Sequence, residues 1–269
     1  MRWVIASVLA ILMGAGLLPV GVDDGAPYIG IAHASSTESI AELRKTAFKL
    51  TQEGQFDLAE QYWGQLIERL PDQPALWSNR GNVRVSQNKV DAAIDDYTTA
   101  IRLSPFEPDP YLNRGAALEA TGQWQAAIDD YNIVIKLSPD DPAAYNNRGN
   151  AQGGQGNWRE ALADYEHSIE INPAFSLGYT NYALALYQVG DAVKSLQILR
   201  SLVRKYPNFA DARATLTAVL WEAGNQGEAE SQWVAARGLD RRYADLDWVT
   251  TVRRWPPSLV MALDHFLHL

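Results

Sequence analysis

Residues 110–139 read PYLNRGAALEATGQWQAAIDDYNIVIKLSP, and residues 144–173 read AYNNRGNAQGGQGNWREALADYEHSIEINP. The two stretches start 34 residues apart, and both carry Asn-Arg-Gly near the start, a Gly near the middle and a Pro at the end. The closing Pro recurs every 34 residues from Pro71 to Pro207. A marker that returns at a fixed interval of this length is typical of a chain built from stacked repeats.

Two further columns of residues keep the same 34-residue interval. One column is Gly54, Asn88, Gly122, Gly156, Gly190 and Gly224, and the other is Ala59, Ala93, Ala127, Ala161, Ser195 and Ala229. Together they divide the chain, without insertions, into the units 40–73, 74–107, 108–141, 142–175, 176–209 and 210–243.

Each unit predicts two helices on either side of the Gly or Asn column, where the turn needs a residue that tolerates a positive φ. Small residues at unit positions 8 and 20 let the paired helices approach closely, and large apolar residues at positions 4, 24 and 28 fill the space around them. Tyr111, Tyr131 and Ile135 are such a set. The Pro at position 32 ends the second helix, because it has no N–H and restricts the residue before it.

The unit resembles the tetratricopeptide repeat (TPR) family, and the resemblance covers residues 40 to about 243. It implies an all-α fold, a right-handed α-solenoid of six antiparallel helix pairs in which each pair rests on its neighbour. Residues 244–269 break the pattern at Trp255-Pro256-Pro257, and we expect them to form capping helices over the last repeat. This ending also resembles that of thylakoid-associated TPR proteins of cyanobacteria and chloroplasts.

The first stretch, residues 1–34, has the pattern of an export signal. Arg2 precedes 20 residues, 3–22, without an ionisable side chain, and Ala32-His33-Ala34 supplies a cleavage pattern before Ser35. The alternative is that residues 3–22 remain as a membrane anchor, because about 20 apolar residues can span a bilayer. Either interpretation predicts that the repeats lie outside the cytoplasm, in a periplasm or a thylakoid lumen, after a short lead-in at 35–39.

Composition excludes several classes of activity. The chain has 269 residues, a net charge of -9 and no cysteine, which excludes disulfides, thiolate nucleophiles, thiolate zinc sites and iron–sulfur clusters. An acidic chain without basic runs is a poor ligand for nucleic acid. His265 and His268 share a helix face but lack a third metal ligand. No phosphate loop or nucleophile motif occurs, so we expect no cofactor, no metal and no enzyme activity.

Three units carry an Arg at position 7 and an Asp at position 23. The pairs are Arg80 with Asp96, Arg114 with Asp130, and Arg148 with Asp164. In the other three units both residues are absent, which predicts structural ion pairs within or between units. The neighbouring Asp95 and Asp129 suggest acid–base chemistry, but their recurrence along the array favours a structural role.

In the TPR family, positions 2, 5, 6, 9, 12 and 13 of the first helix line the concave groove that binds partner segments. Here these positions carry many amides: Asn79, Asn82, Asn113, Asn146, Asn147, Asn150 and Asn181. Amides can donate to and accept from the backbone of an extended peptide, although Asn at position 6 also fits repeat geometry alone. The later units add apolar groove residues: Leu177, Leu184, Tyr187 and Trp221. The family's Lys/Arg clamp for a C-terminal carboxylate is not predicted, because the matching positions are mostly neutral.

These observations predict a protein-binding scaffold. Its partner would be an extended or helical segment of another protein, in a complex such as a photosystem that it helps to assemble or maintain. A scaffold for cell-wall or secretion machinery is the alternative within the same class, and an enzyme is the alternative from another class. A second docking surface is predicted at Arg253, Arg254, Trp255 and Phe266, and the C-terminal helix could also support self-association.

Overall fold

The structure is a computed structural model that describes residues 38–268. The predicted targeting segment, 1–34, lies outside the described residues. Residues 38–268 contain fourteen α-helices, one short 3-10 helix and no strand, which confirms the all-α fold class. No helix within 38–268 combines the length and hydrophobicity that a membrane crossing requires.

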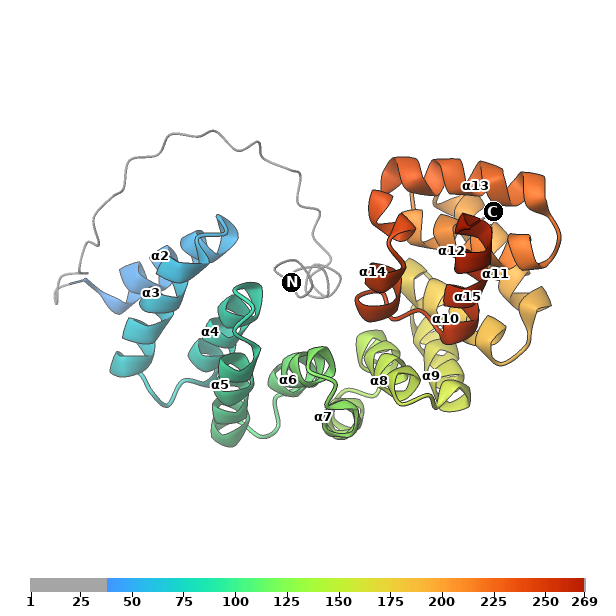
Figure 1. Cartoon of the computed structure of the whole chain (residues 1–269). Coiled ribbons are helices and arrows are strands. Elements are labelled where there is room, and N and C mark those ends of the chain that lie inside the picture. The colour runs from blue at the N-terminus through green and yellow to red at the C-terminus, as the bar shows by residue number, and fades with distance from the viewer. Residues whose placement is uncertain (1–37, 269) are drawn as a thin grey trace, which may run out of the picture. The chain divides into compact units, whose positions relative to one another are not determined.

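The helices fall into two compact units that divide between Thr121 and Gly122. The first unit contains α2 (Ile40–Gln52), α3 (Phe56–Arg69), α4 (Pro74–Ser86), α5 (Val90–Leu103) and α6 (Pro108–Ala120). Consecutive helices of this unit pack against one another from α2 to α6, which Figure 1 shows in blue and green.

The second unit continues the alternation and ends in three shorter elements. Its long helices are α7 (Trp124–Leu137), α8 (Pro142–Gly154), α9 (Trp158–Ile171), α10 (Ser176–Gln188), α11 (Ala192–Lys205), α12 (Ala210–Glu222) and α13 (Gln226–Leu239). The end of the chain forms the 3-10 helix η1 (Arg241–Ala244), α14 (Leu246–Thr251) and α15 (Pro257–Leu267). The last helix packs on α12 and α10 (Figure 1).

Local sequence explains where the helices begin and end. The first helices α2, α4, α6, α8, α10 and α12 start at the residues that open the six sequence units. The turn inside each pair has a positive φ, between 63° at Asn88 and 100° at Gly190. This left-handed conformation is one that Gly and Asn adopt readily. Ser39 and Glu42 form a reciprocal capping box before α2.

The small residue at unit position 8 sets the spacing within a pair. A Cβ added to Gly149 on α8 would lie 2.7 Å from the Tyr165 ring on α9, and one added to Gly81 would lie 2.7 Å from the Tyr97 ring. The two rings therefore pack directly on glycine backbone. Tyr97 and Tyr165 are both buried and fill the space between the paired helices.

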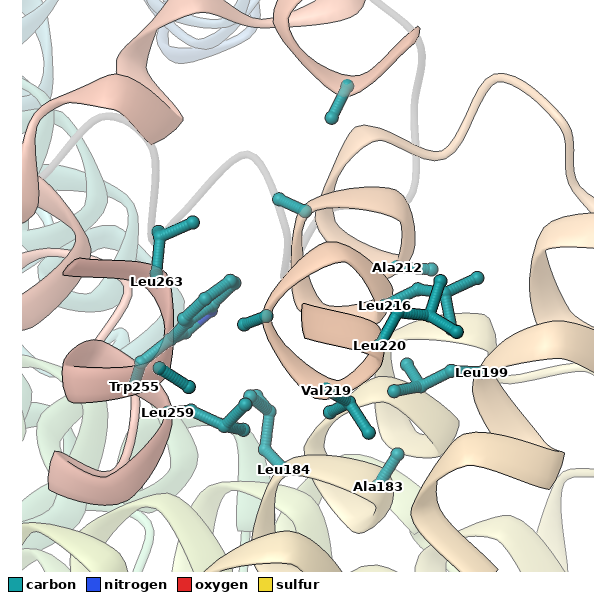
Figure 2. Packing of buried hydrophobic residues seen from close by; sticks show 14 of the residues in the cluster. Ala183, Leu184, Leu199, Ala212, Leu216, Val219, Leu220, Trp255, Leu259 and Leu263 are labelled. Carbon is teal, nitrogen blue, oxygen red and sulfur yellow. The ribbon is translucent and has the colours of Figure 1, made fainter. Parts of the chain in front are cut away.

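The largest apolar core lies at the end of the chain. It joins α10, α11 and α12 to the C-terminal segment, and Figure 2 shows Leu259, Leu263 and Trp255 against the α12 side of this core. Leu216, Leu220, Leu259 and Leu263 are almost completely removed from solvent. Since a fully buried Leu contributes roughly 1.5–3 kcal/mol, this cluster is a major source of stability for the last repeats.

Candidate partner-binding face

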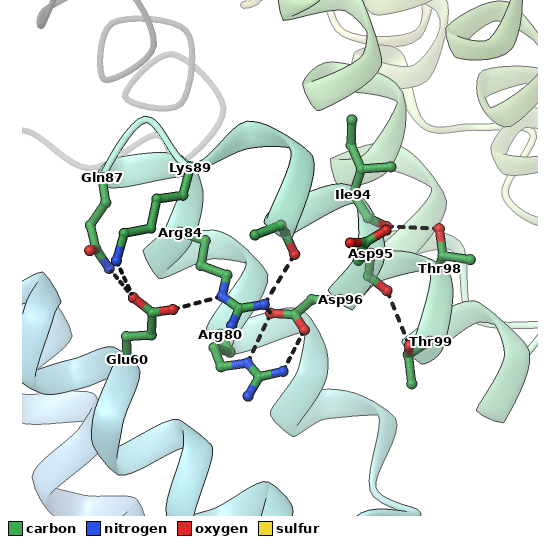
Figure 3. A network of polar contacts seen from close by, with 11 residues as sticks. Glu60, Arg80, Arg84, Gln87, Lys89, Ile94, Asp95, Asp96, Thr98 and Thr99 are labelled. Carbon is green, nitrogen blue, oxygen red and sulfur yellow. Dashed lines mark hydrogen bonds and ion pairs between the residues drawn. The ribbon is translucent and has the colours of Figure 1, made fainter.

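A polar network joins α3, α4 and α5 in the first unit (Figure 3). Arg80 donates from Nε and Nη2 to the two carboxylate oxygens of Asp96, at 3.0 and 2.7 Å. Arg84 donates to the same carboxylate at 2.9 Å and to Glu60 at 2.8 Å. Asp96 is 2% exposed, whereas its neighbour Asp95 is exposed, so the two carboxylates do not form an acid–base pair.

Glu60 has an altered pKa because of this network. Burial alone would raise the pKa of its carboxyl, but hydrogen bonds from Lys89, Arg84 and Gln87 lower it from an ordinary 4.5 to about 2. The Lys89 bond is 2.6 Å and the Gln87 bond is 3.0 Å. Glu60 therefore stays ionised and ties the first repeat to the second.

The second unit repeats the Arg/Asp arrangement. Arg148 donates to both oxygens of Asp164, at 2.8 and 2.7 Å, and its third bond reaches Asn132 on the preceding repeat at 2.7 Å. Arg114 likewise bonds Thr98 on the preceding repeat at 3.1 Å. The predicted partner of Arg114, Asp130, belongs to the other unit, and that pair stays a prediction.

We use the name first-helix face for the stripe at positions 2, 5, 6, 9, 12 and 13 of each first helix. In the first unit, Asn79 and Asn113 on this face are half-buried and make no side-chain hydrogen bond within residues 38–268. Asn82 accepts the hydroxyl of Tyr97 at 2.7 Å, so its oxygen already has a structural partner. Two of the three amides here are thus available to a ligand.

The second unit brings four of the predicted asparagines together, and we call them the amide cluster: Asn146, Asn147, Asn150 and Asn181. Asn181 on α10 donates to Asn146 and Asn150 on α8, at 2.9 and 3.3 Å. The oxygen of Asn150 also accepts the hydroxyl of Tyr165 at 3.0 Å. The cluster therefore links two adjacent repeats and is held in place from the second helix.

One member of the amide cluster has an unused donor. Asn147 is 6% exposed, and its oxygen accepts from Asn146 at 3.3 Å. Its Nδ2 makes no hydrogen bond to any residue in the described part of the chain. A buried donor without a partner costs roughly 1–3 kcal/mol, so this amide gains most from an acceptor brought by a ligand.

Sequence models of the tetratricopeptide repeat match residues 81–122, 120–156, 142–175 and 177–208. The chain is a tetratricopeptide repeat protein. A comparison with curated protein sequences found no match.

Similar solved structures support the same fold. YrrB, described as a TPR protein with an unusual peptide-binding site, is 15% identical, covers 77% of this chain and 98% of its own, and gives a TM-score of 0.55. MamA of Desulfovibrio magneticus RS-1 is 14% identical, covers 61% and 93%, and gives 0.58. The APC/C hetero-tetramer Cut9–Hcn1 is 15% identical, covers 82% and 43%, and gives 0.67. At sequence identities of 14% and 15%, the similarity shows a shared fold only.

The apolar part of the predicted TPR groove is in contact with the chain's own last helix. Leu184 is 5% exposed and belongs to the core, and Tyr187 and Trp221 pack against the same cluster as α15. The chain's own C-terminal helix lies on this part of the face, so the role of these three side chains as partner contacts stays a prediction. Leu177, at the start of α10, is half-buried.

The predicted second docking surface is also largely internal to the TPR fold. Trp255 is 3% exposed, and Arg253 forms an ion pair with Asp211 in which both side chains are mostly buried. Phe266 packs edge-on against Trp221 at 5.3 Å between ring centroids. Arg254 stacks over Trp124, with its Cζ 5.1 Å from the ring centroid. The prediction of a docking surface at Trp255 and Arg253 is corrected, because these residues attach the C-terminal segment to the repeats.

Sequence reasoning missed the polar residues that receive this segment. Asp211 at position 2 of the sixth TPR accepts from Arg253 and from the Tyr243 hydroxyl, the latter at 2.7 Å. Burial would lower the pKa of Arg253, but the Asp211 carboxylate raises it, so the pair stays charged. Gln188 accepts from the backbone N–H of Ser258 at 3.2 Å. The available signal in the sequence was the charged residue Asp211 at position 2 of this repeat.

His265 and His268 of this TPR protein make ordinary polar contacts. His265 lies 2.9 Å from Glu222, and His268 lies 2.7 Å from Asp264. Between residues 38 and 268, no three His, Cys, Asp or Glu side chains gather in a geometry that could hold a metal ion.

Proposed function

We propose that this TPR protein is a scaffold that binds an extended segment of a partner protein along the first-helix face, centred on the amide cluster. The observation that carries the proposal is the Nδ2 group of Asn147, which is buried and has no hydrogen-bond partner within residues 38–268. A peptide carbonyl of the partner would accept this donor.

The chemistry of the face favours a peptide backbone over a charged ligand. The amides of the cluster are neutral and offer both donors and acceptors, and the chain carries a net charge of -9. Asn181 and Tyr165 fix the Asn146 and Asn150 side chains, so little side-chain freedom is lost on binding. The description of YrrB as a peptide-binding TPR protein is consistent with this use of the fold.

A more specific proposal concerns the compartment in which the protein works and the complex that it serves. We propose that the chain is exported through residues 1–34, or anchored by residues 3–22, and helps to assemble or maintain a membrane complex such as a photosystem. The alternative is a scaffold of the cell envelope that serves wall or secretion machinery. Membrane association would then come from the N-terminal segment or from the partner.

The test is an in-cell crosslinking pull-down with three forms of the full-length protein. The Asn113→Ala/Asn147→Ala variant should lose at least tenfold of the captured partner, because it removes the position-6 amides of α6 and α8. The control is Asn225→Ala, which changes an exposed amide at the start of a second helix. Photosystem or envelope subunits captured by the wild type and the control alone would support the proposal and identify the compartment. Equal capture by all three forms would refute it.

A further inference from the structure

The C-terminal segment runs along the first-helix face of the fifth and sixth repeats. Arg253 meets Asp211 at the start of α12, and Ser258 donates to Gln188 at the end of α10. Further along α15, His265 contacts Glu222 at the end of α12. The segment therefore contacts this face at unit position 2 of the sixth repeat and at unit position 13 of both repeats.

The side chains that hold α15 have the spacing of a helical ligand. Leu259, Ala262, Leu263 and Phe266 stand at i, i+3, i+4 and i+7, and the first three are at most 1% exposed. Figure 2 shows Leu259 and Leu263 on the same side of α15, facing Leu184 and the α12 core. Partner helices that bind in apolar grooves use this same spacing of anchors.

The connection to α15 carries two unfavourable features. Arg254 has a φ of 54°, a left-handed conformation that a residue with a Cβ seldom adopts. The Nε1 group of Trp255 is buried and has no hydrogen-bond partner within residues 38–268. Both unfavourable features exist only while the segment is docked. They therefore reduce the favourable free energy of docking that the apolar contacts provide.

We infer that α10 and α12 form a docking groove for an amphipathic helix, and that α15 fills this groove in cis until a partner helix replaces it. The partner helix carries large or small apolar anchors at i, i+3, i+4 and i+7, and a basic side chain opposite Glu222, where His265 now lies. The groove shares α10 with the amide cluster, through Asn181, but the inference rests on the contacts of α15 and not on the proposed function.

The probe is a fluorescently labelled peptide with the chain's own sequence WPPSLVMALDHFLH, residues 255–268. In the wild type the tethered helix competes at an effective concentration of the order of millimolar, so the peptide should bind weakly. Phe266→Ala weakens the tethered helix by removing its contacts with Trp221 and Trp233. Its Kd for the peptide, measured by fluorescence anisotropy, should fall at least tenfold. The control Met261→Ala changes an exposed side chain of the same helix and should match the wild type.

A second arm locks the groove in the intact protein. The chain has no cysteine, so Gln188→Cys/Ser258→Cys introduces the only two thiols, and a short bismaleimide can join them across the contact between α10 and α15. The crosslinked protein should not bind the peptide, while the same variant capped with a monofunctional maleimide should bind at least as well as the wild type. Equal binding by the two forms, or no gain in Phe266→Ala, would overturn the inference.

Hydrogen exchange supplies a measurement without any variant. If α15 leaves the groove while the repeats stay folded, its amides should exchange at least tenfold faster than those of α12. Equal protection of α15 and α12 would show that the helix is a permanent cap and would overturn the inference. A concentration-dependent dimer that the peptide dissociates would support it, with the α15 of a second copy as the incoming helix.

Discussion

Arg253 on the C-terminal segment and Asp211 on α12 form a two-point ion pair in which the side chains are 14% and 6% exposed. The Tyr243 hydroxyl donates to the same carboxylate at 2.7 Å. One carboxylate of the sixth repeat thus accepts from Tyr243, at the end of that repeat, and from Arg253, in the segment that follows the repeats.

Removing one partner of this pair should be strongly destabilising. Arg253→Met leaves the Asp211 carboxylate buried with only the Tyr243 bond, which should lower the free energy of unfolding by about 3–5 kcal/mol. Urea unfolding followed by circular dichroism measures the change. Lys49→Met, at a side chain that is 70% exposed, is the control and should stay within about 0.5 kcal/mol of the wild type. A wild-type midpoint for Arg253→Met would contradict the structural role of the pair.

The repeat period made much of the fold predictable from one sequence. Because every unit has the same geometry, a residue pair that appears and disappears together across units indicates a contact. This is how the pairs of Arg80 with Asp96 and Arg148 with Asp164 were inferred, and the structure has both. In the fifth unit, position 7 is Tyr182, which bonds Glu166 on the preceding repeat and Lys194 on its own repeat. This combination of residues does not recur in the other units, so periodicity could not predict these contacts.

The C-terminal segment could not be placed in this way. Residues after 243 occur once, so their contacts depend on the complementarity of one helix with one face, and periodicity says nothing about where they land. The sequence showed the anchors Leu259, Leu263 and Phe266 at helical spacing, but not that they would cover Leu184 and Trp221. The burial of Asn146 and Asn147 was missed for a related reason, since it depends on packing between neighbouring repeats.

Arg80 lacks a contact that the equivalent arginines have. Arg114 and Arg148 each bond a polar side chain on the preceding repeat, at Thr98 and Asn132. The equivalent position before Arg80 is Gly64, where an added Cβ would lie 4.0 Å from Nη1 of Arg80.

Gly64→Asn should therefore stabilise the protein by about 1 kcal/mol, since it adds a hydrogen-bond acceptor and removes a helical glycine. Thermal or urea unfolding measures the gain. In an Arg80→Met background the acceptor has no donor, and the gain should shrink to a few tenths of a kcal/mol from helix propensity. An equal gain in both backgrounds would mean that the new amide does not reach Arg80.

The lowered pKa of Glu60 predicts a pH-dependent contribution to stability. The folded-state pKa, about 2, lies below the ordinary 4.5, so the stabilisation is complete above about pH 5 and is lost as the pH falls toward 2. Because the side chain is partly exposed, we expect about 1 kcal/mol in total.

Glu60→Gln should show this as a difference that changes with pH. The variant should be about 1 kcal/mol less stable than the wild type at pH 7, and the difference should narrow steadily between pH 4.5 and pH 2. Urea unfolding at a series of pH values measures it. A difference that stayed constant down to pH 2 would indicate that the Glu60 network contributes through packing and not through its charge.

Within the amide cluster, structural and ligand-binding roles should separate. Asn150→Ala removes an acceptor that Tyr165 and Asn181 share, and should cost about 1–3 kcal/mol of stability. Asn147→Ala removes a donor that has no partner within residues 38–268 and one long bond, of 3.3 Å, from Asn146. Its cost should be about 0.5 kcal/mol or less, because an unpaired buried donor is removed at the same time.

We therefore expect Asn147→Ala to be the more stable of the two variants but to capture less of the partner. Asn147→Ala should unfold like the wild type yet lose the crosslinked partner, because its free N–H is the group offered to a ligand. Asn150→Ala should unfold earlier and retain the partner at temperatures where it is folded. If Asn147→Ala destabilised as much as Asn150→Ala and retained the partner, the four asparagines would be a structural bridge between the fourth and fifth repeats, and the partner would bind elsewhere on the first-helix face.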